Sequence, residues 1–405
     1  MKKNNLYLKN LADKCTNCGN CRIICPVFKI KKEEIYSTRG RINLIKGFLN
    51  KELNSTKELK NKIFICLNCK QCASFCPADV EYIEIMTNSK PGINQGNKFF
   101  NPKNFFFKKL FSEEPQVTDF YFKILKKLNN HLFKSKKLNF ASYVILKIFR
   151  LDKFMKFSAI PDNNFFKMNI RHKLKDSKGF RIALFLGCGG KYLYPETSDN
   201  FVNIMRTGGI EVIIPKDQVC CGNPLNYRGL MKYADRNMSA NTSSFNSMLD
   251  IKYIVSLCPN AANLLKEHNS ENSKPGLRFP VKECIEFIID NQIAVNPKYD
   301  NSIIYHSCPK CGNSDIYSKF VKRLYEDYTH IPEYINDFCG STELLDKSNC
   351  DLRNSITQSF IEKHDLKGND FIACSSFECV EHLNEFFINN KMTIKAIHFL
   401  DAIIP

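Results

Sequence analysis

The chain has 405 residues, of which 43% are hydrophobic, and a formal net charge of +18. This length and composition suffice for more than one domain with a buried core. We expect neither a membrane-spanning helix nor a secretory signal peptide, because no run of about 18 apolar residues occurs and the first residues lack an apolar stretch. The 19 cysteines cluster in motifs, which favours a reducing cytoplasm where thiolates stay available for metal.

Two cysteine runs with the same spacing follow a short helix or coil predicted over residues 1–14. Each run reads C-x₂-C-x₂-C-x₃-C-P, which is the spacing that binds cubane iron–sulfur clusters in bacterial ferredoxins. One run is a good signal for such a cluster, and two in tandem are a very strong one. The cysteines and prolines of the two runs are Cys15, Cys18, Cys21, Cys25 and Pro26, and Cys66, Cys69, Cys72, Cys76 and Pro77.

The fourth cysteine of each run is expected to bind the cluster of the other run, because the chain turns away from the first three ligands. A zinc site is a weaker alternative, since zinc sites tend to pair two C-x₂-C units over a longer gap. A disulfide framework would need an oxidising compartment. The rule assigns one 4Fe–4S cluster to Cys15, Cys18, Cys21 and Cys76, and the other to Cys66, Cys69, Cys72 and Cys25.

Between the two runs, residues 29–62 carry apolar positions with helical spacing. A helical insert of this kind predicts an α-helical ferredoxin domain over residues 1–97. Two arginines in the insert, Arg39 and Arg41, either donate to an anionic cluster or partner or are solvated charges at a helix start.

The next segment, residues 98–180, differs in composition from its neighbours. Counted from Lys98 to Arg181, it holds 20 Lys or Arg against 6 Asp or Glu, and 18 Phe or Tyr. We predict a basic, aromatic helical linker. Three interpretations stay open: contact with an anionic membrane surface, docking of a partner subunit, or packing against the adjacent domains with the lysines in water. Nucleic acid is a poorer interpretation, because no binding motif accompanies the charge.

Alternating strand and helix patterns begin at residue 181. Short apolar strands are predicted over residues 181–186, 210–214 and 253–257, each followed by cysteine. Repeating βα units predict a parallel sheet, and ligand sites lie at the carboxyl ends of its strands. The cysteines at these ends therefore predict a metal site, with a structural zinc site or redox-active thiols as alternatives. They are Cys188, Cys220, Cys221 and Cys258.

The same unit recurs, which predicts two halves over residues 181–292 and 301–405. The offsets between matching cysteines are 120 (308 minus 188), 118 (339 minus 221) and 116 (374 minus 258). Phe338 stands where the first half has Cys220, and His306 is expected to be a core or supporting residue. The cysteines of the second half are Cys308, Cys339 and Cys374, with Cys311 and Cys379 as substitutes.

This order of parts resembles the iron–sulfur subunit of glycolate oxidase and its relatives in lactate utilisation. It is similar in plan to the iron–sulfur subunits of anaerobic glycerol-3-phosphate dehydrogenase and heterodisulfide reductase. The segment over residues 38–46 resembles the glycolate oxidase subunit most. The fold class predicted is α+β multidomain: an α-helical ferredoxin domain with two 4Fe–4S clusters, a basic helical linker, and a duplicated α/β cysteine-rich (CCG) domain.

The resemblance implies a non-catalytic electron-transfer subunit of an oxidoreductase. It would receive electrons from a FAD-binding subunit that oxidises glycolate or lactate and pass them towards membrane quinone. It would be cytoplasmic, with or without peripheral contact to the inner face of the membrane. Heterodisulfide-reductase-type repeats use five cysteines to bind one noncubane cluster. Here Ala261 stands at one of these positions in the first repeat, and Phe338 stands at another in the second repeat. We therefore expect a third cluster in the first half, leave the second half open, and disfavour disulfide reduction by the chain itself.

Overall fold

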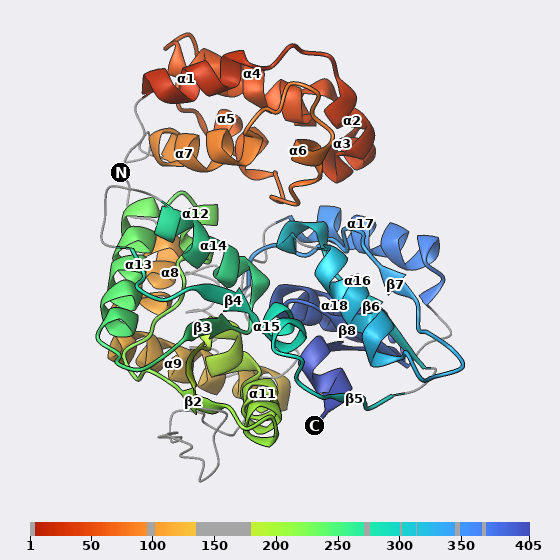
Figure 1. Cartoon of the computed structure of the whole chain (residues 1–405). Coiled ribbons are helices and arrows are strands. Elements are labelled where there is room, and N and C mark those ends of the chain that lie inside the picture. The colour runs from red at the N-terminus through yellow and green to blue at the C-terminus, as the bar shows by residue number, and fades with distance from the viewer. Residues whose placement is uncertain are drawn as a thin grey trace.

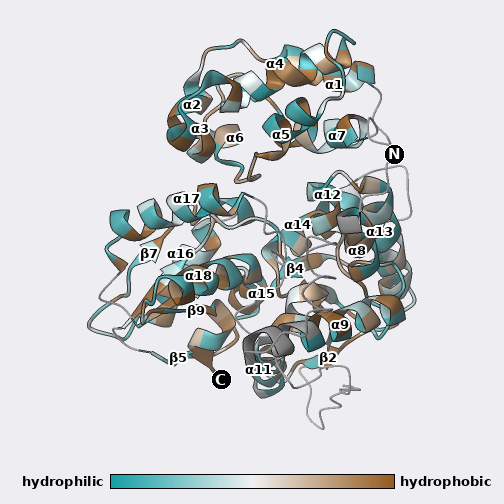
Figure 2. Cartoon of the chain, turned by 180° about the vertical axis from the view of Figure 1, so that it is seen from behind, coloured by the Kyte–Doolittle hydropathy of each residue, from teal (hydrophilic) through white to brown (hydrophobic). Residues whose placement is uncertain are grey.

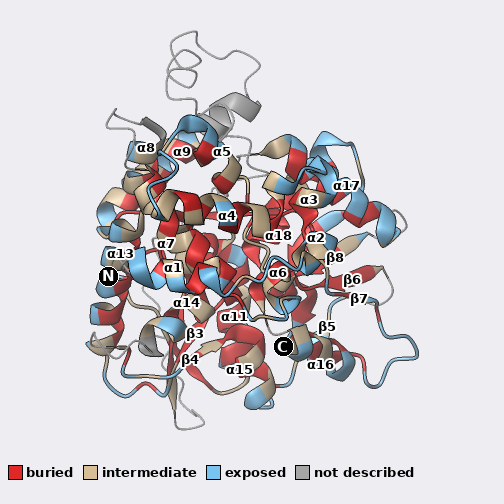
Figure 3. Ribbon diagram, turned by 90° about the horizontal axis from the view of Figure 1, so that it is seen from above, coloured by how far each residue is buried: buried red, intermediate tan, exposed pale blue. Residues whose placement is uncertain are grey.

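The computed structural model describes residues 5–94, 102–134, 180–270, 276–299, 302–312, 314–344, 349–366 and 370–405. A helical domain, formed by residues 5–94, lies across two α/β halves that stand side by side (Figure 1). Seen from above, this helical domain covers the region where the two halves meet (Figure 3). Among the described residues, no helix is long and apolar enough to cross a membrane.

The N-terminal domain contains helices and no strand among residues 5–94. The side chain of Ser37 accepts a hydrogen bond from the Gly40 amide, and that of Thr56 accepts one from the Leu59 amide, so both residues cap helices that follow them. Buried apolar residues such as Ile45 and Ile85 join these helices in one core. The elements are α1 (Asn5–Asp13), α2 (Asn20–Ile24), α3 (Pro26–Lys31), η1 (Glu34–Tyr36), α4 (Thr38–Leu49), α5 (Lys57–Phe64), α6 (Gln71–Ser74) and α7 (Tyr82–Asn94).

Two helices of the basic segment, α8 (Pro102–Leu110) and α9 (Pro115–Lys134), pack on the first α/β half. The ring of Phe122 stacks on that of Tyr192 with 3.9 Å between the centroids, and Tyr192 donates to Asp119 at 2.7 Å. The described part of the segment thus packs against a neighbouring domain. The rest of it, residues 98–101 and 135–179, lies outside the described residues, so the membrane and partner interpretations stay predictions.

The first α/β half is built on a four-stranded parallel sheet with strand order β2-β1-β3-β4. Its strands are almost wholly buried, as expected for a parallel sheet with helices on its faces. The elements are β1 (Arg181–Phe185), η3 (Gly189–Leu193), α11 (Pro195–Thr207), β2 (Glu211–Ile213), α12 (Asn223–Tyr227), α13 (Met231–Asn246), β3 (Tyr253–Ser256), α14 (Pro259–Ser270), β4 (Val281–Glu283) and α15 (Cys284–Asp290).

The second half has a parallel sheet with the corresponding order, β7-β6-β8-β9. Figure 2 shows its helix α17 largely hydrophilic on the outer side. The elements are β5 (Asn296–Pro297), β6 (Ile303–His306), η4 (Pro309–Cys311), α16 (Ser314–Leu324), β7 (Tyr334–Ile335), α17 (Cys350–Lys363), β8 (Phe371–Cys374), α18 (Phe377–Asn389), β9 (Lys395–His398), η6 (Phe399–Ala402) and β10 (Ile403–Ile404).

The two halves share one hydrophobic core, which contains residues of both sheets. At their boundary the ring of Tyr194 stacks on that of Phe377 at 5.4 Å, and the Tyr194 hydroxyl donates to Glu381 at 2.8 Å. Gly189 is required at this contact, because a Cβ there would lie 2.3 Å from the Phe377 ring. The halves are therefore held as one body, with the ends of both sheets turned towards the helical domain.

Candidate metal centres

One group of ferredoxin cysteines lines a cavity near the surface of the helical domain. Cys15, Cys18, Cys21 and Cys76 all line this cavity, together with Cys72. Cys18 is exposed. Cys76 thus lies with the first three cysteines of the first run, as the crossed assignment requires. Four thiols suit the soft irons of a cluster.

The other group of ferredoxin cysteines is more deeply buried. Burial raises the pKa of the Cys69 thiol well above its usual value, and the adjacent Cys72, Cys66 and Cys25 thiols raise it further. Burial also raises the pKa of Cys72 to about 12, with Cys66 and Cys25 again adding to the effect. Cys25 therefore lies beside the second run, although it belongs to the first. We call these four cysteines the inner group, and Cys15, Cys18, Cys21 and Cys76 the outer group.

The two cysteine loops have the same unusual backbone. Asn17 and Gly19 have φ of 56° and 88°, and Asn68 and Lys70 have φ of 51° and 62°. Positive φ on both sides of the middle cysteine bends the chain tightly around the thiols. Successive amides in such a bend can point at one anion, which suits a negatively charged cluster.

Arg41 is one of the largest fully buried side chains, with 1% of its surface exposed. Its guanidinium donates to the Tyr82 hydroxyl at 3.0 Å and lies 4.0 Å from the sulfur of Cys25. Burial acts against its charge, but Tyr82, Cys66 and Cys25 raise the pKa of Arg41 above its usual value. The solvated-charge interpretation is therefore wrong for Arg41, because the side chain lies beside the inner group.

Arg39 is partly exposed and lies at the outer group instead. It donates to Glu34 and, at 2.7 Å, to the Asn17 carbonyl in the first cysteine loop. It also lines the cavity of the outer group. Each of the two arginines in the insert thus serves a different cysteine group.

The predicted cysteines of the first half come together at the ends of β1, β2 and β3. The sulfurs of Cys188 and Cys220 lie 3.8 Å apart. Hydrogen bonds to Cys188 and Cys221 raise the pKa of Cys220 well above its usual value, with burial adding to them. Burial raises the pKa of Cys258, and Glu378 and Cys221 raise it further. Cys258 therefore lies within electrostatic reach of Cys221.

The second half gathers a set of cysteines that differs in one member from the expected set. Cys339 lies 3.6 Å from Cys379, sulfur to sulfur. Burial raises the pKa of Cys308 well above its usual value, and Cys339 and Cys379 raise it further. The thiol of Cys374 donates to the carbonyl oxygen of Ile372 at 3.8 Å, and it also lies within electrostatic reach of Cys379 and Cys339. Cys379, expected only as a substitute, thus takes the place given to Cys374.

Cys379 takes this place because the predicted alignment of the second half on the first was wrong by two residues. The strands β3 and β8 begin 118 residues apart (371 minus 253), as do the helices α14 and α18 (377 minus 259). The offset of 116, which paired Cys374 with Cys258, is therefore wrong. At an offset of 118, Cys374 corresponds to Ser256, and Cys379 corresponds to Ala261. Phe338 is buried in the apolar core of this half, in agreement with its prediction as a lost ligand position.

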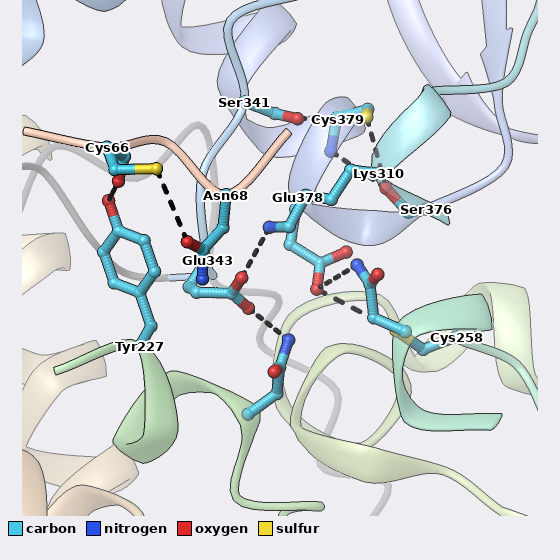
Figure 4. A network of polar contacts seen from close by, with 12 residues as sticks. Cys66, Asn68, Tyr227, Cys258, Lys310, Ser341, Glu343, Ser376, Glu378 and Cys379 are labelled. Atoms are coloured by element: carbon cyan, nitrogen blue, oxygen red, sulfur yellow. Dashed lines mark hydrogen bonds and ion pairs between the residues drawn. The ribbon is translucent and has the colours of Figure 1, made fainter. Parts of the chain in front are cut away.

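A polar cavity of about 250 Å³ lies where the helical domain meets the two halves. The loop of the inner group reaches it with Asn68 and Lys70, the first half with Cys221, and the second half with Lys310 and Glu343. Figure 4 shows the hydrogen bonds and ion pairs around it. Tyr227, Asn223, Asn260 and Glu378 also take part in that network.

Lys310 and Glu343 form a buried ion pair of 2.6 Å, with side-chain exposures of 4% and 3%. Asn223 of the first half donates to the other oxygen of Glu343 at 2.6 Å. Sequence reasoning missed these residues, because no motif marks them and they meet only through the packing of separate domains.

The comparisons with known proteins agree with this arrangement. Residues 11–80 match the 4Fe-4S dicluster domain family, and residues 182–266 match the cysteine-rich domain family. The chain carries a 4Fe-4S dicluster domain followed by a cysteine-rich domain. It is 22% identical over 264 residues to the probable glycolate oxidase iron–sulfur subunit of Bacillus subtilis, covering 63% of this chain and 58% of that protein.

Two further relatives are similar at the same level. The glycolate oxidase iron–sulfur subunit of Escherichia coli is 25% identical over 210 residues, covering 51% of this chain and 46% of the relative. Lactate utilization protein A of Oceanobacillus iheyensis is 18% identical over 240 residues, covering 55% of this chain and 96% of the relative. The predicted resemblance is thereby confirmed. The chain spans about half the length of the glycolate oxidase relatives.

Proposed function

We propose that this chain is the electron-transfer subunit of a flavin-dependent 2-hydroxy-acid dehydrogenase. A FAD-binding partner would oxidise glycolate or lactate, and this chain would carry the electrons towards membrane quinone. The relatives are iron–sulfur subunits by name, and the chain carries the two domain types on which such a role depends. The chemistry on the substrate would then belong to the partner.

The observation that carries the proposal is the order of the cysteine groups through the molecule. The outer group reaches the surface at Cys18, and the inner group lies beneath it. The hydroxyl of Tyr227 in the first half donates to the Cys66 carbonyl at 3.1 Å. Asn68 of the inner loop and Cys221 of the first half then line one cavity. Electrons entering at the outer group would meet a continuous series of thiol-bound centres.

The proposal includes two 4Fe–4S clusters, on the outer and inner groups, and a third cluster on the first half, in a molecule whose two α/β halves arose by duplication. The cluster ligands in the first half would be Cys188, Cys220, Cys221 and Cys258. When bound, each cluster supplies one-electron transfer. The protein's own contribution is to hold the thiols, shield them from water and keep the centres in order.

A heterodisulfide-reductase-like or glycerol-3-phosphate-dehydrogenase-like role is the alternative for the same parts. Disulfide reduction on a five-thiolate cluster is disfavoured, because the buried Ala261 and Phe338 stand where further cysteines would be needed.

Peripheral contact of residues 98–180 with anionic lipid belongs to the proposal as well. Flotation with anionic liposomes that salt reverses would support it, and absence of flotation at low salt would refute it.

The test is anoxic purification of the tagged chain from its own host. We expect a FAD-containing protein to co-purify, about eight irons from the outer and inner groups, and up to four more from the first half. Adding glycolate or lactate to the complex should then reduce the iron–sulfur centres and change their EPR spectrum. A chain purified without iron would overturn the proposal. So would an iron-loaded chain whose iron–sulfur centres are not reduced when glycolate or lactate is added together with the flavoprotein.

A further inference from the structure

The outer group differs from the inner group in what covers it. The two runs match at an offset of 51 (66 minus 15), and their loops have positive φ at matching residues. In the inner loop, Leu67 is 1% exposed and packs in the core of the second half. Its counterpart Thr16 is exposed, as is Cys18 two residues later. In the part of the chain that the structure describes, the outer loop therefore faces solvent.

Large apolar side chains are exposed beside the outer loop. Ile23 of α2 is 68% exposed, and Phe75, which directly precedes Cys76, is 51% exposed. Figure 1 shows α2 and α6 at the same end of the helical domain, and the two helices pack against each other. Pro77, on the other side of Cys76, is also exposed and lines the cavity of the outer group. Apolar side chains gathered on one exposed surface mark an interaction site more often than single ones do.

The edge of this surface carries surplus positive charge. Arg22 lies 3.3 Å from one carboxylate oxygen of Glu34, and Arg39 contacts the other oxygen. One carboxylate thus serves two guanidinium groups. Between residues 14 and 34, five basic side chains are exposed against two acidic ones. A partner that covers this surface is therefore expected to be acidic at its edge, because like charges across an interface are unfavourable.

We propose that this surface is the docking site for the FAD-containing protein that donates electrons to the chain. The inference rests on the proposed function, which requires such a partner, and it adds the place and the chemistry of the contact. The outer group is the exposed end of the series of cysteine groups, so a donor that docks here comes close to the first centre. We call the docking residues the outer face: Ile23, Phe75 and Pro77 at the centre, and Arg22 and Arg39 at the edge.

A protein fits the outer face better than a lipid membrane does. Glu34 contacts both arginines, and its carboxylate would be repelled by anionic lipid but can accept hydrogen bonds from a protein. Membrane binding grows with the buried apolar area, of which three side chains supply little. Transient redox complexes, in contrast, have small interfaces with an apolar core and a polar rim. The matching loop of the inner group is likewise covered by protein.

The first test measures binding and electron transfer with the FAD-containing protein that co-purifies with the chain. Ile23→Glu and Phe75→Glu place a negative charge in the apolar centre, and each should raise the Kd about 30-fold, as expected for the loss of a central contact. Reduction of the clusters by glycolate or lactate through the partner should slow. Reduction by dithionite, a small reductant that needs no docking site, should stay unchanged, as should the iron content.

Two substitutions on the α/β halves are the matched controls. Leu249 and Ile388 are apolar and exposed by 72% and 62%, so Leu249→Glu and Ile388→Glu make the same chemical change away from the outer face. Both should leave the Kd unchanged. Arg22→Glu should lower the association rate and weaken its dependence on salt, because charges at the edge of an interface act mainly on the encounter of the partners.

The second test identifies what covers the outer face. Replacement of Phe75 by the photoreactive p-benzoylphenylalanine in the full chain should produce a cross-link to the FAD-containing protein in the host cell. A cross-link to a second copy of the chain, or to its own residues 135–179, would overturn the assignment. Flotation with anionic liposomes that Ile23→Glu abolishes would do the same, because the outer face would then bind lipid.

The outcomes separate this inference from the proposed function. If the partner binds Ile23→Glu and Phe75→Glu as tightly as the unchanged chain and reduces their clusters at the same rate, it docks elsewhere. The inference is then wrong, and the proposed function stands. If no FAD-containing protein co-purifies with the chain, the proposed function fails, and the docking assignment fails with it.

Discussion

Cys76 decides whether the two ferredoxin runs exchange ligands. It lines the same cavity as Cys15, Cys18 and Cys21, whereas Cys25 affects the pKa values of the second run. A Cys76→Ser change replaces a soft thiolate by a hard, weakly acidic hydroxyl, which iron binds poorly. We expect loss of the outer cluster or its conversion to a three-iron form, while the inner cluster persists.

The measurement is a comparison of EPR spectra. The spectrum of Cys76→Ser should match that of Cys15→Ser and differ from that of Cys66→Ser, and Cys25→Ser should behave in the opposite way. A Cys76→Ser spectrum that matches Cys66→Ser would mean that each run binds its own cluster.

Arg41 provides a second prediction at the level of one residue. Its buried guanidinium lies 4.0 Å from the Cys25 sulfur, so it stabilises the more negative, reduced state of a cluster held there. Arg41→Gln should lower the midpoint potential of the inner cluster by on the order of 60 mV, because a hydrogen bond to a charged group contributes about 1.5 kcal/mol. Arg41→Lys, which keeps the charge, should recover part of the shift.

A redox titration followed by EPR would measure this shift, with Arg39→Gln as the control. Arg39 contacts the outer loop, so its replacement should leave the potential of the inner cluster unchanged. Equal shifts of both clusters in Arg41→Gln would argue against a local effect.

Among the secondary-structure elements, α9 offers a way to test whether the basic segment packs into the core of the first α/β half. Phe122 is 3% exposed and stacks on Tyr192, whereas Phe120 on the same helix is 59% exposed. Phe122→Ala should lower the free energy of unfolding by about 3–5 kcal/mol, the usual effect of a buried Phe→Ala change. Phe120→Ala should change it by less than about 0.5 kcal/mol.

Urea unfolding under anoxic conditions, with hydrogen exchange of the α9 amides, would measure both effects. If the two variants are equally stable, α9 does not pack against the first half in solution, and docking to a membrane or partner becomes the better interpretation of the segment.

For the whole molecule, the contact between the helical domain and the first α/β half depends on Lys90. This fully buried lysine of α7 donates to the Tyr227 carbonyl at 2.9 Å and lies 4.4 Å from the centre of the Tyr227 ring. Lys90→Met keeps the length of the side chain but removes the charged donor, which should destabilise the contact by about 1.5–3 kcal/mol. Amide exchange over residues 223–229 should accelerate.

Lys14→Met is the control for this change. Lys14 lies in the same domain and forms an ion pair with Glu81 in which both side chains are about half exposed, so its loss should have a small effect. Equal exchange rates in Lys90→Met and the unchanged protein would show that the helical domain is held by other contacts.

Several features of this protein were determined by the sequence alone. The two ferredoxin runs are local patterns, because three ligands of each cluster lie within seven residues of chain, and their spacing therefore predicts the chemistry. The strands after residue 181 were predicted near their observed positions because apolar runs and helical periodicity are also local. The resemblance to glycolate oxidase subunits followed from the same motifs.

Only the tertiary structure decided which groups meet across distant segments. The offset of 118 between the halves depends on strand pairing, and a slip of two residues keeps the pattern of buried and exposed side chains, so periodicity could not detect it. The buried position of Arg41, the pairing of Lys310 with Glu343 and the approach of His306 to Cys379 arise likewise from packing between separate elements. Such contacts produce no recognisable pattern within one stretch of sequence, because the residues near each partner reflect only the helix, strand or loop to which it belongs.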